Sequence, residues 1–421
     1  MNCQKENPTT ALAHIADEVR TFYDQRPYPP PVKDLDGYGR RWEDPNRRRA
    51  EFHLFWPERP YQEHLDILVA GCGTAQAAKH ALRHPAARVT GIDVSSTSIR
   101  HTEDLKRKYD LTNLEIHQLP VEQAHELEQS FDKIVCTGVL HHLPDPSAGL
   151  SVLRDVLKPD GAMHLMVYAT FGRTGIYMLQ QYCRLLGIGQ SDREITDLAH
   201  TLMAIPPNHP LAPLLAEVPD FRTKAGLADA LIHPLDRAYT VPQLFELIRR
   251  AGLTFGRWLR QAPYLPQCGS LAQSPHGKRL AQLSPEEQYG ALELFRGTMV
   301  RHNVFIYRDD RPATGPSMGF DDEQWLTYVP IRLPESMLVQ EGLPPGAVAV
   351  LINRNHTDKD LVLPIDEGQK QLFEGIDGKV SIAEIVDSMP GKGRSQDHQG
   401  ARTFFEQLWW YDQVVFVTYN R

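Results

Sequence analysis

The chain has 421 residues, of which 41% are hydrophobic and 23% charged, so it is long enough for two or three domains with ordinary cores. Its formal net charge of -8 argues against a nucleic-acid-binding protein, because such proteins neutralise phosphates with Lys and Arg. We expect a cytoplasmic protein, since the five cysteines include no close pair and neither a signal peptide nor an apolar run of about 18 residues for a membrane span is found.

Residues 1–60 are expected to form an N-terminal cap. A helical pattern runs from Ala11 to Tyr23, and Pro27 forbids its continuation because proline lacks the backbone N–H that a helix needs. The segment from Tyr28 to Pro31 contains three consecutive prolines and should be extended.

Short apolar runs alternate with helical patterns between residues 65 and 168, which is typical of a mainly parallel sheet. The predicted strands are 65–70, 88–93, 114–117, 131–136 and 162–168. The predicted helices are 74–83, 96–109 and 146–157. The proline and glycine between Lys158 and Gly161 predict a turn that ends the last of these helices.

Beyond Tyr168 the pattern is helical, and we expect a helical lid inserted at about 171–237. Strands at 253–259 and 300–308, separated by an excursion at about 262–298, would complete the sheet. Residues 61–310 are thus predicted to form an α/β domain with a Rossmann-like, mainly parallel seven-stranded sheet. For residues 320–421 we predict a small α+β, winged-helix-like domain. Its expected strands are 348–352 and 413–417, and its expected helices are 366–373, 382–387 and 399–410.

A predicted buried strand runs directly into Gly71-Cys72-Gly73 and then into a helix, which indicates a ligand-binding turn. Asp93 ends the next strand, twenty residues after Gly73, where a carboxylate can bind two ribose hydroxyls. Dinucleotide enzymes share this arrangement, but their G-x-G-x-x-G fingerprint requires glycine at the position of Gln76. An NAD-linked oxidoreductase is therefore the weaker interpretation.

Four motifs in order, covering roughly residues 65 to 170, resemble those of class I S-adenosylmethionine-dependent methyltransferases. They are Val69-Ala70-Gly71-Cys72-Gly73-Thr74, Gly91-Ile92-Asp93-Val94-Ser95, the run from Phe131 to Leu143, and the run from Leu153 to Gly161. The resemblance implies S-adenosylmethionine as the cofactor and transfer of its methyl group by in-line displacement, with no metal required.

The resemblance also assigns cofactor-binding positions. Gly71 and Gly73 would lie under the methionine part, Asp93 would bind the ribose, and Val94 would flank the adenine. The segment with Pro120 and Val121 would cover the other adenine face, although many relatives place an acid there, a role open to Glu122 or to a backbone carbonyl. The remaining candidates are Tyr28, Cys72, Thr74, Gln76, Thr137 and Gly138. Tyr28 either closes over the cofactor or packs the cap onto the core.

His141 and His142 follow the fourth predicted strand and so lie at the carboxyl edge of the sheet, where ligands bind in open α/β folds. Either histidine could act as a general base, or both could simply pack in the loop. Candidate substrate-binding residues are Tyr168, Arg173, Tyr177 and His233, for which an ordinary packing role is the alternative.

The resemblance leaves the methyl acceptor open. A small molecule is our first expectation. A protein or peptide side chain is an alternative that the extra C-terminal domain would suit, and a non-catalytic cofactor-binding adaptor is another. The acceptor atom and the oligomeric state do not follow from the sequence.

Overall fold

The computed structural model describes residues 8–312, 318–389 and 394–419. They form two compact units. The first consists of the described parts of Met1–Gly39, Glu63–Gly256 and Arg296–Asp310, and the second of Arg40–Gln62, Arg257–Phe295 and the described parts of Arg311–Arg421. The predicted cap therefore contributes to both units, and Cys3 lies outside the described residues. Within the described ranges, no helix has both the length and the apolarity needed to cross a membrane.

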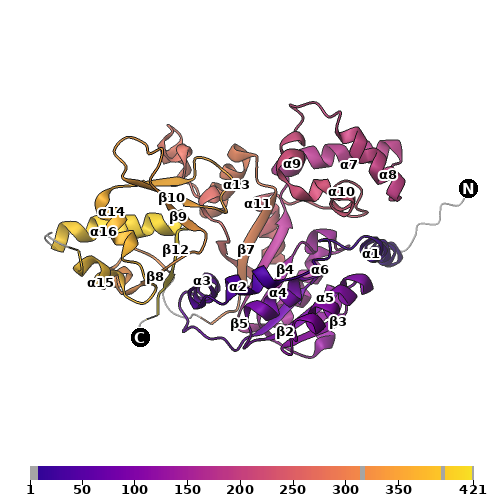
Figure 1. Cartoon of the computed structure of the whole chain (residues 1–421), viewed down its shortest axis with the longest axis horizontal. Coiled ribbons are helices and arrows are strands. Elements are labelled where there is room, and N and C mark those ends of the chain that lie inside the picture. The colour runs from indigo at the N-terminus through magenta and orange to yellow at the C-terminus, as the bar shows by residue number, and fades with distance from the viewer. Residues whose placement is uncertain (1–7, 313–317, 390–393, 420–421) are drawn as a thin grey trace, which may run out of the picture. The chain divides into compact units, whose positions relative to one another are not determined.

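The sheet of the first unit has seven strands in the order β3-β2-β1-β4-β5-β7-β6, which confirms the predicted Rossmann-like arrangement (Figure 1). Strands β1 to β5 pair in parallel, and β7 runs antiparallel to β5. The strands are β1 (Asp66–Ala70), β2 (Arg88–Asp93), β3 (Leu114–Gln118), β4 (Phe131–Thr137), β5 (Leu157–Tyr168), β6 (Leu253–Trp258) and β7 (Arg301–Arg308). The order places the carboxyl ends of β1, β2 and β4 next to one another.

The turn predicted between Lys158 and Gly161 is wrong, because β5 already begins at Leu157. An irregular register against β4, between Phe131 and Lys133, accommodates these residues. The ammonium of Lys158 lies 2.8 Å from a carboxylate oxygen of Asp66 and 2.8 Å from one of Asp132. Lys158 therefore links β5 to the starts of β1 and β4.

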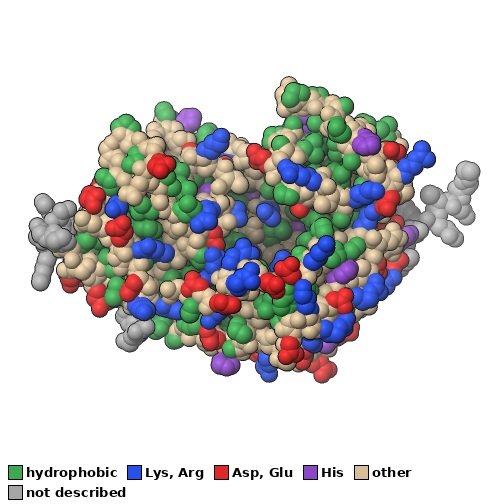
Figure 2. Space-filling model, viewed as in Figure 1, with side chains coloured by type: hydrophobic (Ala, Val, Ile, Leu, Met, Phe, Trp, Pro, Cys, Tyr) green, Lys and Arg blue, Asp and Glu red, His purple; other side chains and the backbone are tan. Residues whose placement is uncertain are grey.

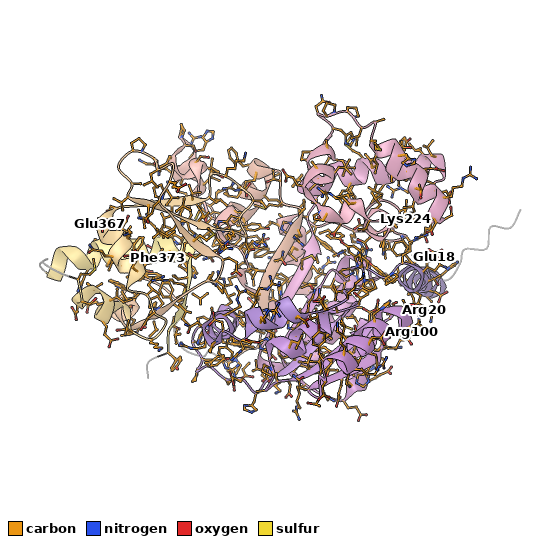
Figure 3. All side chains as sticks on the ribbon, viewed as in Figure 1. Glu18, Arg20, Arg100, Lys224, Glu367 and Phe373 are labelled. Carbon is orange, nitrogen blue, oxygen red and sulfur yellow. The ribbon has the colours of Figure 1, made fainter. Side chains whose placement is uncertain are left out.

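Helices with well-formed starts connect these strands. Ser95 caps α5 by accepting the backbone N–H of Ser98, and Asp145 caps α6 by accepting those of Ser147 and Ala148. The helices are α1 (Pro8–Gln25), α4 (Gln76–Arg83), α5 (Ser96–Lys108), α6 (Pro146–Asp155) and α11 (Val241–Arg250). Helix α1 packs on α5. Figure 3 labels the exposed side chains of Glu18 and Arg20 on α1 and of Arg100 on α5.

The segment predicted as a helical lid forms a group of helices between β5 and α11, and its role as a lid stays a prediction (Figure 1). They are α7 (Thr174–Leu186), α8 (Asp192–Leu202), α9 (Ala212–Glu217) and α10 (Lys224–Leu231). Buried apolar side chains of the lid, among them Ile176, Ile195 and Leu227, form one cluster with Phe22 of α1. The lid is therefore anchored on the N-terminal helix by hydrophobic packing.

The second unit contains two small sheets, in the orders β11-β10-β9 and β12-β8. Its strands are β8 (Val329–Arg332), β9 (Ser336–Val339), β10 (Ala349–Asn353), β11 (Val362–Ile365) and β12 (Val414–Val417). Its helices are α3 (Pro45–Phe55), α12 (Gly277–Leu280), α13 (Pro285–Arg296), α14 (Glu367–Glu374), α15 (Ile382–Asp387) and α16 (Arg394–Trp410), while α2 (Asp36–Trp42) leads into this unit. Small sheets and helices are thus confirmed, and the likeness to a winged helix stays a prediction.

Candidate active site

The turn after β1 is the first element of the site. Gly71 and Gly73 have φ angles of 71° and 52°, in the left-handed region that favours glycine. A Cβ atom on Gly71 would lie 2.2 Å from Cγ2 of Val139, so the space also requires glycine there. The amides of Gly71 and Cys72 both donate to the carbonyl of Ile92. These two amides are therefore not available to a ligand. What the turn offers a ligand is the backbone of its glycines, which no side chain covers.

The carboxylate of Asp93 faces this turn from the end of β2. Its Oδ2 accepts the N–H of Gly73 at 2.8 Å, and its Oδ1 accepts the N–H of Ser95 at 2.9 Å. Burial raises the pKa of Asp93, and these two hydrogen bonds oppose the rise. Each oxygen keeps a lone pair beyond the one that these bonds use, so the carboxylate can accept two further hydroxyl groups.

The segment after α1 lies against the same turn. Asp24 accepts a hydrogen bond from the hydroxyl of Ser95 at 2.9 Å, and the carbonyl of Pro29 accepts one from the hydroxyl of Thr74 at 2.9 Å. Tyr28 continues this segment to the lid, where its hydroxyl donates to Oδ2 of Asp220 at 2.7 Å. Burial raises the pKa of Tyr28, which keeps its hydroxyl a hydrogen-bond donor.

Gln76 and Thr137 connect the start of α4 to the end of β4. The side-chain nitrogen of Gln76 lies 3.1 Å from the hydroxyl of Thr137, and its side-chain oxygen lies 3.2 Å from the same hydroxyl. Gln76 therefore occupies, with a polar side chain, the position of the third glycine in a pyrophosphate-binding turn.

A cavity of about 440 Å³ joins these elements to the lid. Most of the predicted cofactor positions line it, namely Tyr28, Gly71, Cys72, Gly73, Gln76, Asp93, Val94, Val121, Thr137 and Gly138. Three of the other predicted residues also line it, namely His142, Tyr168 and Arg173. Thr74, Pro120, His141, Tyr177 and His233 are not among the lining residues. The hydroxyl of Thr74 is instead used to hold the N-terminal segment.

Asp229 of α10 lines the same cavity and was not predicted. Its side chain is buried, and its two oxygens accept hydrogen bonds from the hydroxyls of Tyr23 at 3.2 Å and Tyr168 at 3.3 Å. Burial raises the pKa of Asp229, while the neighbouring His142 and Arg173 oppose the rise. One signal in the sequence points to it, because Asp229 is the only charged residue between Leu227 and Leu231.

The backbone of Leu235 sets the hydrogen bonding of two buried histidines. Its carbonyl lies 2.7 Å from Nδ1 of His142, and its N–H donates to Nδ1 of His233 at 3.0 Å. In its neutral form His142 must then carry its proton on Nδ1, which leaves a lone pair on Nε2. His233 must carry its proton on Nε2, and this nitrogen has no hydrogen-bond partner among the described residues.

His141 is fully buried, and its ring lies against that of Tyr168 with 3.8 Å between the ring centroids. Neither of its nitrogens has a partner in the part of the chain that the structure describes. Burial lowers the pKa of His141 well below its usual value, so the ring is neutral. Of the two predicted catalytic histidines, His142 alone reaches the cavity, and the placement of His141 corresponds to the packing alternative.

Arg173 combines two buried contacts at the lid side of the cavity. Its guanidinium forms an ion pair with Asp236 at 3.0 Å and lies 3.5 Å from the centre of the Tyr168 ring. Its Nε also lies 3.1 Å from the hydroxyl of Tyr177. Burial acts against the charge of Arg173, but Asp236, Tyr168 and Tyr177 together outweigh it and raise the pKa of the guanidinium. Tyr177 therefore positions Arg173 from outside the cavity lining.

His142, Asp229 and His233 offer ligand atoms that all lie within 4.8 Å of one another, a spacing compatible with a metal ion. A histidine ligand must present a lone pair to the metal. The amide of Leu235 occupies the Nδ1 lone pair of His233 and so places a proton on its Nε2. In this arrangement His142 and Asp229 each present a ligand atom, but His233 presents an N–H donor. The three residues together therefore do not suit a metal.

Comparison with known proteins agrees with this geometry. A family described as a methyltransferase domain matches residues 68–163. The chain is 29% identical to an uncharacterized protein of Synechococcus sp. over 328 residues, which cover 76% of this chain and 77% of that protein. It is 32% identical to the ubiquinone biosynthesis O-methyltransferase of Neisseria meningitidis over 96 residues, or 23% of this chain and 40% of that enzyme.

The fold also resembles that of PKMT2 from Rickettsia typhi, solved in complex with AdoHcy, with a TM-score of 0.62 and 14% sequence identity. The superposition covers 89% of this chain and 75% of that one. Residues 68–163 thus match a methyltransferase domain, and the sheet that contains them has the Rossmann-like strand order of that fold. The chain's match to the Neisseria enzyme spans less than half of that enzyme, so the methyl acceptor does not follow from the match.

The site fits the S-adenosylmethionine that the sequence resemblance implies. Glycine backbone without side chains lines the cavity at Gly71 and Gly73, and Asp93 presents acceptors for hydroxyl groups beside them. Gln76 fills the position where a dinucleotide enzyme needs glycine for its pyrophosphate. These residues therefore suit a nucleoside that has a small zwitterionic end and no phosphate.

Proposed function

We propose that this enzyme transfers a methyl group in line to a nucleophile on a small-molecule acceptor. The observation that carries the proposal is that one cavity is lined both by the glycine turn and by the polar residues under the lid, His142, Tyr168, Arg173 and Asp229. S-adenosylmethionine supplies an activated methyl group on a sulfonium centre. The residues of the chain bind, orient the two reactants and exclude water, which can provide much of the rate enhancement.

The cofactor-binding roles proposed for single residues follow the family resemblance. Gly71 and Gly73 would lie beneath the methionine part and Asp93 would accept the ribose hydroxyls. Val94 and Val121 both line the cavity and would flank the adenine. Gln76 and Thr137, which are bonded to each other, would border the methionine end.

The size of the cavity supports a small acceptor. Ligand pockets commonly have volumes of about 300–1,000 Å³, and this cavity measures about 440 Å³. The cofactor would take a large part of it, which leaves room for a small molecule or for one side chain of a peptide. Figure 2 shows acidic and basic side chains interspersed on the face in view, which gives no support to a nucleic-acid substrate.

Thermal shift with S-adenosylhomocysteine and with NAD tests the cofactor part of the proposal, because a ligand that binds the folded state stabilises it. We expect stabilisation by S-adenosylhomocysteine alone, and its loss in Asp93→Ala. Asp104→Ala is a matched control, because Asp104 is exposed on α5. Stabilisation by NAD alone would contradict the proposal.

The acceptor class is tested by incubating the enzyme with labelled cofactor and a cell extract, followed by size separation. Label in the small-molecule fraction is expected. Label in the protein fraction would favour the peptide side-chain alternative. Binding of S-adenosylhomocysteine with no transfer in either fraction would favour the non-catalytic adaptor.

A further inference from the structure

The two imidazoles next to the cavity have opposite hydrogen-bonding roles. Because Leu235 accepts from one and donates to the other, His142 presents a lone pair at Nε2 and His233 presents an N–H. The rings are packed together, with 4.0 Å between their centroids. His142 lines the cavity, whereas His233 lies behind it. A buried imidazole whose Nδ1 is bonded to the backbone therefore belongs to the cavity lining.

Asp229 places a carboxyl group beside this proton acceptor, and the neighbouring His142 and Arg173 favour its charged form against the effect of burial. A carboxylate oxygen of Asp229 and an imidazole nitrogen of His142 lie within 4.8 Å of each other. Tyr23 and Tyr168 hold the carboxylate by two hydrogen bonds. Arg173, the nearby cation, is in an ion pair with Asp236. No ion pair joins Asp229 to a cation in the described part of the chain, so its charge is available to balance a new one.

We propose that His142 and Asp229 form a proton-accepting pair for a hydroxyl group on the methyl acceptor. This inference rests on the proposed function of the cavity. The hydroxyl gives its proton to Nε2 of His142 while its oxygen forms the bond to the methyl carbon. The bond between that carbon and sulfur breaks, and its electron pair stays on sulfur. The imidazolium that results is stabilised by the charge of Asp229.

The charges around the cavity favour a neutral hydroxyl over an ammonium group. Three aspartates (Asp93, Asp220 and Asp229) and two arginines (Arg173 and Arg301) line the cavity, and the sulfonium centre of the cofactor brings one further positive charge into it. An ammonium acceptor would add another positive charge at short range in a poorly solvated site, where such repulsion is costly. Tyr23, Tyr168 and Tyr28 add hydroxyl groups and aromatic rings but no charge, because burial raises the pKa of each.

The first test needs no methyl acceptor. It uses nitrogen NMR of the histidines in the full-length protein with S-adenosylhomocysteine bound. Long-range correlations distinguish a proton on Nδ1 from one on Nε2. We expect the proton on Nδ1 in His142 and on Nε2 in His233, with signals assigned from His142→Gln and His233→Gln. Exposed His200 provides the reference for a solvated ring. A proton on Nε2 of His142 would overturn the proposal, because that nitrogen could not accept one.

The activity test compares phenol with 4-nitrophenol, which is ionised in mildly alkaline buffer and needs no base. His142→Gln should lower methyl transfer to phenol by about 100-fold or more, and transfer to 4-nitrophenol much less. Asp229→Asn should show the same selectivity. His200→Gln and Asp197→Asn, both on exposed positions of α8, are matched controls that should leave transfer unchanged.

Three outcomes count against the proposal. Equal losses with both phenols would mean that His142 has a structural role. Transfer to aniline in preference to phenol would assign the cavity to amines. Absence of transfer to either phenol, in a protein that S-adenosylhomocysteine stabilises, would exclude the hydroxyl class. Failure of S-adenosylhomocysteine to stabilise the protein would instead contradict the proposed function itself.

Discussion

Gly71 approaches Val139 so closely that a Cβ atom on the glycine would lie 2.2 Å from Cγ2 of the valine. The loop after β4 thus packs directly on the turn after β1, and the two loops together form one wall of the cavity. A side chain at position 71 has to move either the valine or the turn.

The first prediction concerns this contact. Gly71→Ala should abolish binding of S-adenosylhomocysteine in calorimetry and lower the free energy of unfolding. The left-handed backbone alone costs an alanine about 1–2 kcal/mol, and the overlap with Val139 adds to it. Gly39→Ala is the control, because a Cβ there meets nothing within 4 Å. Unchanged binding in Gly71→Ala would show that the turn does not carry the cofactor.

The second prediction concerns the bond between Tyr28 and Asp220, which joins the N-terminal segment to the lid at 2.7 Å. Tyr28→Phe should weaken binding of S-adenosylhomocysteine about 2- to 10-fold, since one hydrogen bond contributes about 0.5–1.5 kcal/mol. Calorimetry measures the effect, with Tyr182→Phe on the outer face of α7 as control. An identical dissociation constant in Tyr28→Phe would favour the packing role for this tyrosine.

The third prediction concerns the buried ion pair of Arg173 and Asp236. Arg173→Met should destabilise the protein by about 3–5 kcal/mol, because it leaves a buried carboxylate without its cation. The double variant, Arg173→Met with Asp236→Leu, should lose less stability than the sum of the losses in the two single variants. Urea unfolding of the four proteins gives the coupling free energy. Strict additivity would mean that the pair does not act as a unit.

The fourth prediction concerns pH. Burial lowers the pKa of His53, on α3, to about 4, although a hydrogen bond to the carbonyl of Trp56 opposes this. The folded pKa lies below the unfolded value of 6.5, so the unfolded chain binds the proton more readily. Stability should therefore fall as pH decreases from about 6.5 to about 4, by up to roughly 3 kcal/mol from this group. Urea unfolding of wild type and His53→Asn across this pH range measures the loss of stability. An equal pH dependence in both proteins would contradict the prediction.

The elements that sequence patterns predicted well are those with strong local signals. Strand β1 is largely apolar and leads into Gly71, and β2 has a buried middle and ends at Asp93; both observed strands agree closely with the predicted ones. Strands β8, β9 and β11 have four residues each and were missed, whereas the equally short β12 was predicted because all four of its residues are apolar. The segment 158–161 was read as a turn because its proline and glycine outweighed pairing with β4, which only the fold provides.

The acceptor side of the site was harder to predict because it depends on contacts distant in the sequence. Asp229 meets Tyr23 across 206 positions, and no spacing rule connects two such residues. The roles of His142 and His233 depend on the backbone of Leu235, which carries no side-chain signal at all. Local patterns therefore located the glycine turn and its carboxylate, while the residues that face the methyl acceptor required the packing of the lid.

The hydrogen bonds of Asp24 to Ser95 and of Pro29 to Thr74 have a practical consequence for truncation. A shortened protein that starts near residue 61, just before the first strand of the sheet, keeps every strand and both glycines of the turn. It lacks the peptide that covers the turn and the tyrosine that reaches the lid. The smallest working piece of this enzyme must therefore include the segment from Asp24 to Pro29.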